Sequence, residues 1–237
     1  MIYVSDQEAK EQIIEFGKRA YSRGFVAAND GNVTVRVGEN EVWCTPTGVS
    51  KGFMTEEMLV KMDLDGNILV EGTKPPTSEI KMHLRVFREN PEVMSVFHAH
   101  PQVATAFACA GIPLNTKAYL IESILAIGVV PCVHYADPGT EGVPDSVAPY
   151  VRTHNGVLLA NHGALTWGRS AEEAFYRMES VEYSAKAMVL NEYILKQYMP
   201  LSDDQVNYIV GVRKKHGIET GGRPESVKEA VNLEDHI

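Results

Sequence analysis

Apolar side chains recur at three- and four-residue intervals in the first part of the chain and at two-residue intervals directly after it. The helical spacing runs from Asp6 to Arg23, and Gly24 is placed to end this helix. Either Ser5 or Asp6 can cap its first turn. In residues 33–44, valines then alternate with polar side chains on both sides of a Gly-Glu-Asn turn. The pattern predicts an N-terminal helix followed by a β-hairpin.

The remainder of the chain alternates between these two spacings. Strand-like runs are separated by turn residues such as Asp65-Gly66-Asn67, and helical runs end at glycine or proline. We expect further strands at 59–63, 68–70, 93–100 and 129–133, and further helices from Glu79 to Pro91, at 102–110, between 114 and 128, at 170–196, and ending near Lys215. Such an alternation indicates an α/β fold.

Two apolar runs lead directly into histidines. His98 and His100 close the run that begins at Val93, and His162 follows the apolar stretch 156–161. Side chains two residues apart in a strand point to the same face, so His98 and His100 can bind one ion. Three imidazoles leave a coordination position open, as catalytic zinc sites do, whereas structural zinc sites are closed by four ligands rich in cysteine. The pattern favours a catalytic metal site over separate structural histidines.

Composition narrows the classes of protein and partner. A chain of 237 residues with 44% hydrophobic content can bury one continuous core. The net charge of -9 argues against a nucleic acid or an anionic membrane as partner. Cys44, Cys109 and Cys132 form no Cys-x-x-Cys pair, and so sparse a set suggests a reducing compartment. The first residues carry no charged-then-apolar leader and no apolar stretch reaches membrane-spanning length, so we expect a soluble, cytoplasmic protein.

Three turns rich in glycine and hydroxyl side chains form a second candidate site, at residues 29–32, 45–48 and 75–78. Each can be an ordinary turn. In the third, Thr77 and Ser78 stand where a helix begins, and there the free backbone N–H groups and the helix dipole favour an anion. A phosphate can bind at such a place without a lysine, and Glu79 would stand beside it.

Taken in order, these motifs resemble the class II aldolase/adducin family, and within it the L-fuculose-1-phosphate aldolases. The segments that carry the resemblance are Gly31-Asn32-Val33-Thr34-Val35-Arg36, Thr45-Pro46-Thr47-Gly48, Thr77-Ser78-Glu79, His98-Ala99-His100 and Asn161-His162-Gly163. The similarity extends from the first helix to about Gly217. It implies an α/β/α sandwich around a mainly antiparallel sheet, assembled as a homotetramer with active sites at the subunit interfaces.

The resemblance also implies roles for individual residues. Its zinc ion, one per subunit, would be bound by His98, His100 and His162. Its phosphate cradle would consist of Asn32, Thr47, Gly48, Thr77 and Ser78. Glu79 would be the catalytic acid/base. Zinc suits this chemistry because a Lewis acid stabilises the enediolate that forms when a carbon–carbon bond next to a ketone breaks.

Two further positions match the family pattern in part. Tyr119 falls where a tyrosine from a neighbouring subunit protonates the aldehyde oxygen in the resembling aldolases. Those aldolases can also end in a mobile tail with a tyrosine, and this chain has His216 at that place. His216 can take over the role of the tail tyrosine or change the substrate preference.

The reaction that the resemblance implies is reversible cleavage of a ketose 1-phosphate, such as L-fuculose 1-phosphate, into dihydroxyacetone phosphate and a small aldehyde such as lactaldehyde. Related enzymes leave alternatives open: a dehydratase of the methylthioribulose-1-phosphate type, a ribulose-5-phosphate 4-epimerase and a 3-oxo-tetronate phosphate decarboxylase. The epimerases usually carry aspartate at the position of Glu79, so glutamate favours the aldolase. A noncatalytic adducin-like module would have lost metal ligands, and none is missing here.

Residues 219–237 extend beyond the family domain, which we expect to span residues 1–218. The stretch Thr220-Gly221-Gly222-Arg223-Pro224 predicts a flexible link, and apolar residues after it predict a short helix. We expect this tail to pack on its own tetramer or to fray. A docking peptide for a larger assembly, such as a bacterial microcompartment shell, is the alternative.

Overall fold

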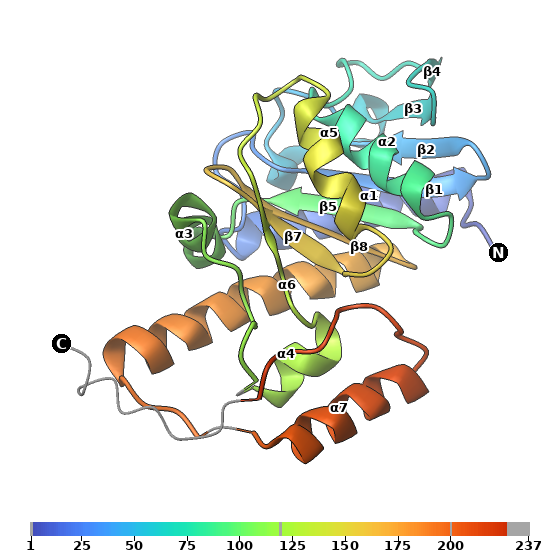
Figure 1. Ribbon diagram of the computed structural model, residues 1–237. Helices are drawn as coiled ribbons and strands as arrows, with labels where there is room; N and C mark the ends of the chain where they lie inside the picture. The colour runs from blue at the N-terminus through green and yellow to red at the C-terminus, as the bar shows by residue number, and fades with distance from the viewer. Residues whose placement is uncertain (1, 119, 200, 227–237) are drawn as a thin grey trace.

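An eight-stranded sheet forms the centre of the computed structural model, which describes residues 2–118, 120–199 and 201–226 (Figure 1). Its strand order is β4-β3-β2-β1-β5-β8-β7-β6. The strands are β1 (Asn32–Gly38), β2 (Glu41–Cys44), β3 (Val60–Asp63), β4 (Ile68–Val70), β5 (Ser95–Ala99), β6 (Cys132–Val133), β7 (Gly156–Leu159) and β8 (Gly163–Gly168). Neighbouring strands pair antiparallel except β6 and β7. The mainly antiparallel sheet is thus confirmed.

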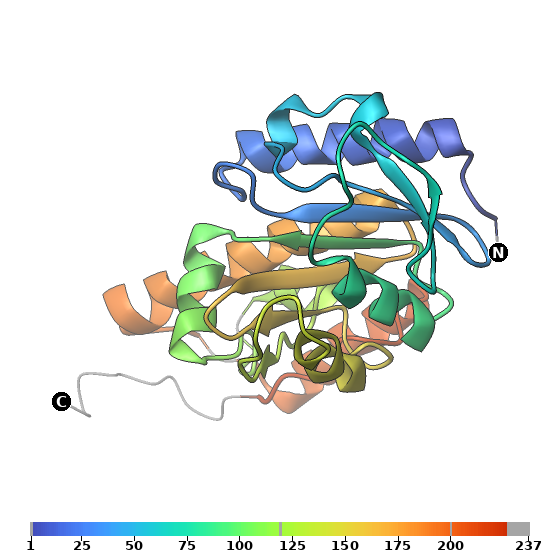
Figure 2. The same ribbon diagram turned by 90° about the horizontal axis from the view of Figure 1, so that it is seen from above.

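Helices cover both faces of this sheet, as Figure 2 shows from above. The α-helices are α1 (Asp6–Ser22), α2 (Ile80–Glu89), α3 (Gln102–Ala110), α4 (Ile121–Ala126), α5 (Gly142–Val147), α6 (Ala171–Met188) and α7 (Asp203–Lys215). On one face, α1, α3 and α6 share a core with the sheet in which the Phe175 ring contacts those of Phe16 and Phe97. On the other face, α2 and α5 share a second core. The three layers confirm the expected α/β/α sandwich.

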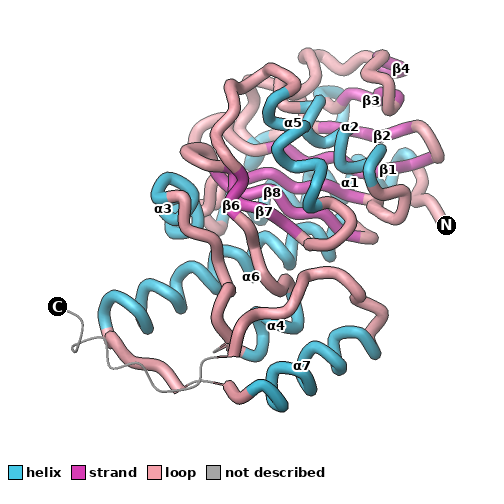
Figure 3. Tube along the Cα trace, in the orientation of Figure 1, coloured by secondary structure: helices cyan, strands magenta, loops and turns pink. Residues whose placement is uncertain are grey.

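Beyond α6, helices α4 and α7 form a small additional layer (Figure 3). Buried Arg213 of α7 donates to the carbonyl of Ile124 at 3.0 Å, which joins the two helices. The segment expected to be a flexible link returns to this layer and to the body, since Gly221 N–H donates to Thr153 and Glu225 N–H to Thr116, both at 2.8 Å. The short helix predicted in the tail lies outside the described residues, and the boundary at residue 218 stays a prediction.

Local sequence signals predict most of the helices and strands, but not the end of α6 and not α5. Ser5 caps α1 in a capping box with Glu8, as the spacing predicts. The α-helix expected to reach residue 196 ends at Met188 and continues as the π-helix Val189–Ile194. The sequence analysis predicts no helix over Gly142–Val147, where the structure has α5 with Pro144 in its first turn, a position at which a missing N–H costs nothing. None of the described helices has the length and hydropathy that crossing a membrane requires.

A buried carboxylate connects α6 to the segment that follows the first two histidines. Glu182 is 3% exposed and accepts hydrogen bonds from the backbone N–H groups of Val103, at 3.1 Å, and Ala104, at 2.9 Å. Both groups belong to the first turn of α3, where N–H groups lack partners within the helix. Glu182 therefore caps α3, which begins only two residues after His100.

Replacing Glu182 by alanine should lower the free energy of unfolding by about 2–4 kcal/mol, because two buried N–H groups would lose a charged acceptor. Glu179 is the matched control, since it lies on the same helix and pairs with Arg23 at 2.8 Å near the surface. Glu179→Ala should cost less than about 1 kcal/mol. Urea unfolding followed by circular dichroism measures both, and equal losses would contradict the capping role.

Candidate metal centre and substrate site

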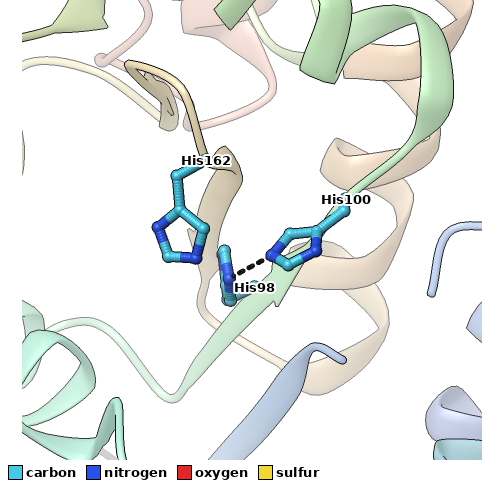
Figure 4. A group of neighbouring side chains, drawn as sticks. All are labelled: His98, His100 and His162. Carbon is cyan, nitrogen blue, oxygen red and sulfur yellow. Dashed lines mark hydrogen bonds between the residues drawn. The ribbon is translucent and has the colours of Figure 1, made fainter. Parts of the chain in front are cut away.

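Three histidines from two distant segments meet at one end of the central strands (Figure 4). His98 lies in β5, His100 directly follows it, and His162 occupies the turn between β7 and β8. In the antiparallel register, Ala99 of β5 stands opposite Ala164 of β8, so the β7–β8 turn lies beside the end of β5. One ligand atom from each histidine lies within 4.8 Å of those of the other two.

The turn that carries His162 depends on its two flanking residues. Asn161 has a φ of 58°, in the left-handed region that asparagine tolerates better than most residues. At Gly163, an added Cβ would lie 2.5 Å from the His100 ring and 2.6 Å from the carbonyl oxygen of Ala99. Any side chain at position 163 would therefore displace His100, so the Asn-His-Gly order is what lets the imidazoles converge.

Hydrogen bonds at the Nδ1 atoms leave the Nε2 atoms of two rings free. His98 Nδ1 lies 2.9 Å from the carbonyl oxygen of Ala164, which can only accept, so Nδ1 carries the hydrogen. His100 Nδ1 likewise lies 3.3 Å from the carboxylate of Asp30. In the neutral rings, the two Nε2 lone pairs then face each other across 3.0 Å, along the dashed line in Figure 4. This arrangement is unfavourable unless a cation binds between them.

Burial keeps these rings in the neutral form that binds metals. It lowers the pKa of fully buried His98 to about 4 and also lowers the pKa of His100. With metal–nitrogen bonds of about 2.0–2.1 Å, two ligands of a tetrahedral site stand about 3.3 Å apart, and the two Nε2 atoms are already 3.0 Å apart. The donor set and its spacing therefore fit a divalent metal ion.

The Glu79 carboxylate lies against the same nitrogens. Glu79 occupies the N-cap position of α2, but its side chain makes no capping bond. It turns instead to His162 Nε2, 3.1 Å from Oε1, and to His98 Nε2, 3.5 Å from Oε2. Asn32 Nδ2 donates to Oε2 at 2.6 Å. Burial by itself raises the pKa of Glu79, but the positive charge that the imidazoles acquire in acid, together with the Asn32 amide, outweighs it and holds the pKa well below its usual value. The carboxylate is ionised and placed to accept a proton.

The three turns singled out in the sequence lie together next to Glu79. Thr45 N–H donates to the Val33 carbonyl at 3.1 Å, which joins the second turn to β1. Thr47 N–H donates to Pro75 at 2.9 Å, and Thr77 N–H donates to Thr45 at 3.0 Å, which joins the second turn to the third. The structure thus places Thr47, Gly48, Thr77 and Ser78 on connected loops, and Asn32 at the start of the adjoining strand β1. Within the described residues, the hydroxyls of Thr47 and Ser78 have no hydrogen-bond partner and are free to bind a ligand.

Two predicted site residues, Tyr119 and His216, are not found in this cluster among the described residues. Tyr119 lies outside the described residues. His216 is the exposed C-cap residue of α7, and Gly217 after it lines a pocket with Gly168 and Arg169. Gly168 ends β8, whereas His162 precedes its start. Within one chain, His216 therefore lies at the opposite end of β8 from the histidine cluster.

The sequence motifs reveal neither Asp30 as a partner of the cluster nor the buried His83 close to Glu79 and His98. Asp30 belongs to a turn interpreted as a ligand loop, and its contact with His100 Nδ1 exists only because β1 pairs with β5. His83 was missed altogether. It lies one helical turn after Glu79, is fully buried, and its Nδ1 is 2.9 Å from Thr34 Oγ1. The four-residue spacing from Glu79 is the signal that could have indicated a second polar side chain on that helix face.

The chain matches the family described as Class II Aldolase and Adducin N-terminal domain over residues 11–189. This range contains the three histidines, Glu79 and the three loops. The chain belongs to the class II aldolase/adducin family. The resemblance stated from the motifs is thereby confirmed.

Relatives within this class II aldolase family carry names of two different reactions. The chain is 31% identical to a 3-oxo-tetronate 4-phosphate decarboxylase of Haemophilus influenzae, over 77% of this chain and 88% of the relative. It is 30% identical to an L-fuculose phosphate aldolase of Methanocaldococcus jannaschii, over 79% of this chain and 99% of the relative. A solved L-fuculose 1-phosphate aldolase superposes with a TM-score of 0.80 at 30% identity, over 90% of this chain and 98% of that structure. Membership of the family therefore does not decide the reaction.

Replacing His98 by alanine should abolish stoichiometric metal binding, because the buried ligand between the other two imidazoles would be lost. His154, a histidine half-buried away from the cluster, is the control, and His154→Ala should keep the wild-type metal content. Elemental analysis after gel filtration measures the bound metal. A His98→Ala protein that holds as much metal as wild type would contradict the ligand assignment.

Proposed function

We propose that this class II aldolase family member is a zinc-dependent lyase that reversibly cleaves a ketose 1-phosphate into dihydroxyacetone phosphate and a small aldehyde. L-fuculose 1-phosphate, with lactaldehyde as the aldehyde, is the substrate that the aldolase relatives suggest. The observation that carries the proposal is the Glu79 carboxylate, which Asn32 holds against His98 and His162. A base thus stands beside a metal-binding cluster and next to loops with free hydroxyl groups.

In this proposal the connected loops bind the phosphate and the histidine cluster faces the ketone. Zinc, bound by the three imidazoles, supplies Lewis-acid polarisation of the substrate carbonyl. Thr47 and Ser78 offer hydroxyl donors to the phosphate, and the start of α2 adds backbone N–H groups and the positive end of a helix dipole. These contacts orient the sugar so that its C3 reaches Glu79.

Glu79 carries the proton at carbon in both directions. In cleavage, the C4 hydroxyl gives its proton to the phenolate of Tyr119 of a neighbouring subunit, the C3–C4 bond breaks, and its electron pair moves into the C2 carbonyl, which leaves an aldehyde and an enediolate. Glu79, which has taken a proton from solvent, then gives it to C3 to form dihydroxyacetone phosphate, and Tyr119 returns its proton to solvent. In synthesis, the Glu79 carboxylate removes a hydroxymethyl proton, and Tyr119 of a neighbouring subunit protonates the aldehyde oxygen.

We accordingly propose a cytoplasmic homotetramer with active sites at its interfaces, where His216 can act only across subunits.

Decarboxylation is a second candidate, because a relative at 31% identity carries the name 3-oxo-tetronate 4-phosphate decarboxylase. That compound is a β-keto acid. When it loses CO₂, the electron pair of the C1–C2 bond moves into the C3 ketone, and protonation at C2 gives dihydroxyacetone phosphate. The enediolate is therefore the same as in the aldol reaction, and Glu79 would again supply the proton. The two reactions differ in the leaving fragment, which is an aldehyde in one and CO₂ in the other.

Hydrogen exchange tests the half-reaction that both candidates share. Zinc-loaded protein in deuterated water should exchange a hydroxymethyl proton of dihydroxyacetone phosphate, followed by NMR. Glu79→Gln should keep its zinc and lose at least about a hundredfold in exchange rate, because the amide cannot accept the proton. Wild-type protein that holds zinc and does not exchange would refute the enediolate chemistry.

Product analysis separates the two candidates. Zinc-loaded protein with dihydroxyacetone phosphate and lactaldehyde should form a ketose 1-phosphate, detected by phosphorus NMR, at a rate that falls with Glu79→Gln. A parallel mixture with 3-oxo-tetronate 4-phosphate is assayed for CO₂. Ketose formation without CO₂ release supports the aldolase, whereas CO₂ release without ketose formation would replace it by the decarboxylase.

A further inference from the structure

Lys51 is a buried lysine that bonds to two of the loops at the site. It begins the 3₁₀ helix η1 (Lys51–Phe53), and 2% of its surface is exposed. Its Nζ donates to the carbonyl oxygen of Asn29 at 2.8 Å and to that of Val49 at 2.7 Å. Asn29 belongs to the loop that leads to Asn32, and Val49 directly follows the loop that contains Thr47. One ammonium group thus ties both loops to each other.

This ammonium has no direct counter-charge within the part of the chain that the structure describes. Lys61, also largely buried, contrasts with it, because Lys61 Nζ lies 3.1 Å from Asp6 and 2.8 Å from Glu41. Lys51 contacts carbonyl oxygens only, and Asp30 and Glu79 act on it from a longer range. Burial lowers the pKa of Lys51 to about 8, so it remains mostly charged at neutral pH. A buried charge is costly unless an anion offsets it.

The neighbouring ligand groups are neutral, while the charges already at the site are negative. Asn32 offers an amide, and Thr47 and Ser78 offer hydroxyls. Asp30 and Glu79 carry carboxylates beside the histidines, and the whole chain has a net charge of -9. Apart from the metal ion that the histidines would hold, a phosphate dianion that approaches these loops meets only neutral or negative groups among these side chains, unless another cation lies close to it. Lys51 supplies that cation from beneath two of the three loops.

We propose that Lys51 is a positioning residue for a phosphate monoester dianion: it fixes the two loops and gives their site its positive charge. The inference rests on the proposed function, because it takes these loops to be the place of the substrate phosphate. A buried charge acts strongly over a short range, since little water screens it. The turn residues in the sequence suggest a phosphate site without a lysine. In this proposal, the charge of Lys51 adds to the neutral groups of the loops.

Three variants separate the charge of Lys51 from its hydrogen bonds. Lys51→Met removes both, Lys51→Gln keeps a donor without charge, and Lys51→Arg keeps both. Calorimetry on the zinc-loaded protein measures the Kd of inorganic phosphate. We expect it to rise at least about tenfold in Lys51→Met and Lys51→Gln, because the loops lose the positive charge close to them, and to stay near wild type in Lys51→Arg. Lys61→Met, which removes a lysine already paired with carboxylates, is the matched control and should leave the Kd unchanged.

Several outcomes would overturn the proposal: wild-type protein that binds no phosphate, Lys51→Gln with wild-type affinity, Lys51→Arg no better than Lys51→Gln, or an equal loss in Lys61→Met. Zinc content and melting temperature identify a variant that fails to fold, and the comparison of Lys51→Gln with Lys51→Arg then decides. Phosphate binding needs no turnover. A failure of proton exchange would therefore reject the proposed function while the calorimetry still tests Lys51.

Discussion

The position of β5 between β1 and β8 brings the reactive groups of this protein to one end of its sheet. In the antiparallel register, His98 stands opposite Asn32 on one side and opposite Leu165 on the other. A shift of one residue would turn His98 to the other face of the sheet and separate it from Glu79. Gly163 adds a second constraint, because only a residue without a side chain lets β8 begin so close to His100. The histidine cluster is therefore set by backbone pairing.

The charged groups at the candidate site lack full compensation within the described part of the chain and suit ligands of opposite charge. Burial keeps His98 neutral, so its lone pair is available to a metal ion. Lys51 is a cation that, in the described structure, bonds to carbonyl oxygens and to no carboxylate. Glu79 remains ionised against the same imidazoles. A metal ion would offset the carboxylate, and a phosphate would offset the ammonium. Electrostatic complementarity of this kind is what the proposed function requires, since its substrate would bring a phosphate to the loops and oxygen ligands to a metal ion.

The shared intermediate that we propose would explain how relatives with different reaction names resemble one chain to similar degrees. In the proposed function, aldol cleavage and decarboxylation would both lead to the enediolate of dihydroxyacetone phosphate, so the same base and the same three histidines would serve either reaction. The difference must lie in groups that face the leaving fragment. Pro138 and Val143 border both a cavity beside Glu79 and another beside His162, so the segment from Pro138 to the start of α5 adjoins the centre on that side.

The sequence alone determined the elements whose causes are local, such as α1 with its Ser5 cap, and it identified His98, His100 and His162 by their place after apolar runs. It missed α5, whose first turn tolerates Pro144, and the π-helix Val189–Ile194 that continues α6. Only the tertiary structure paired Asp30 with His100, Asn32 with Glu79 and Lys51 with Asn29, at separations of 70, 47 and 22 residues. Motif spacing reveals side chains that share one element, whereas contacts between elements depend on strand register and loop closure, which no local pattern encodes.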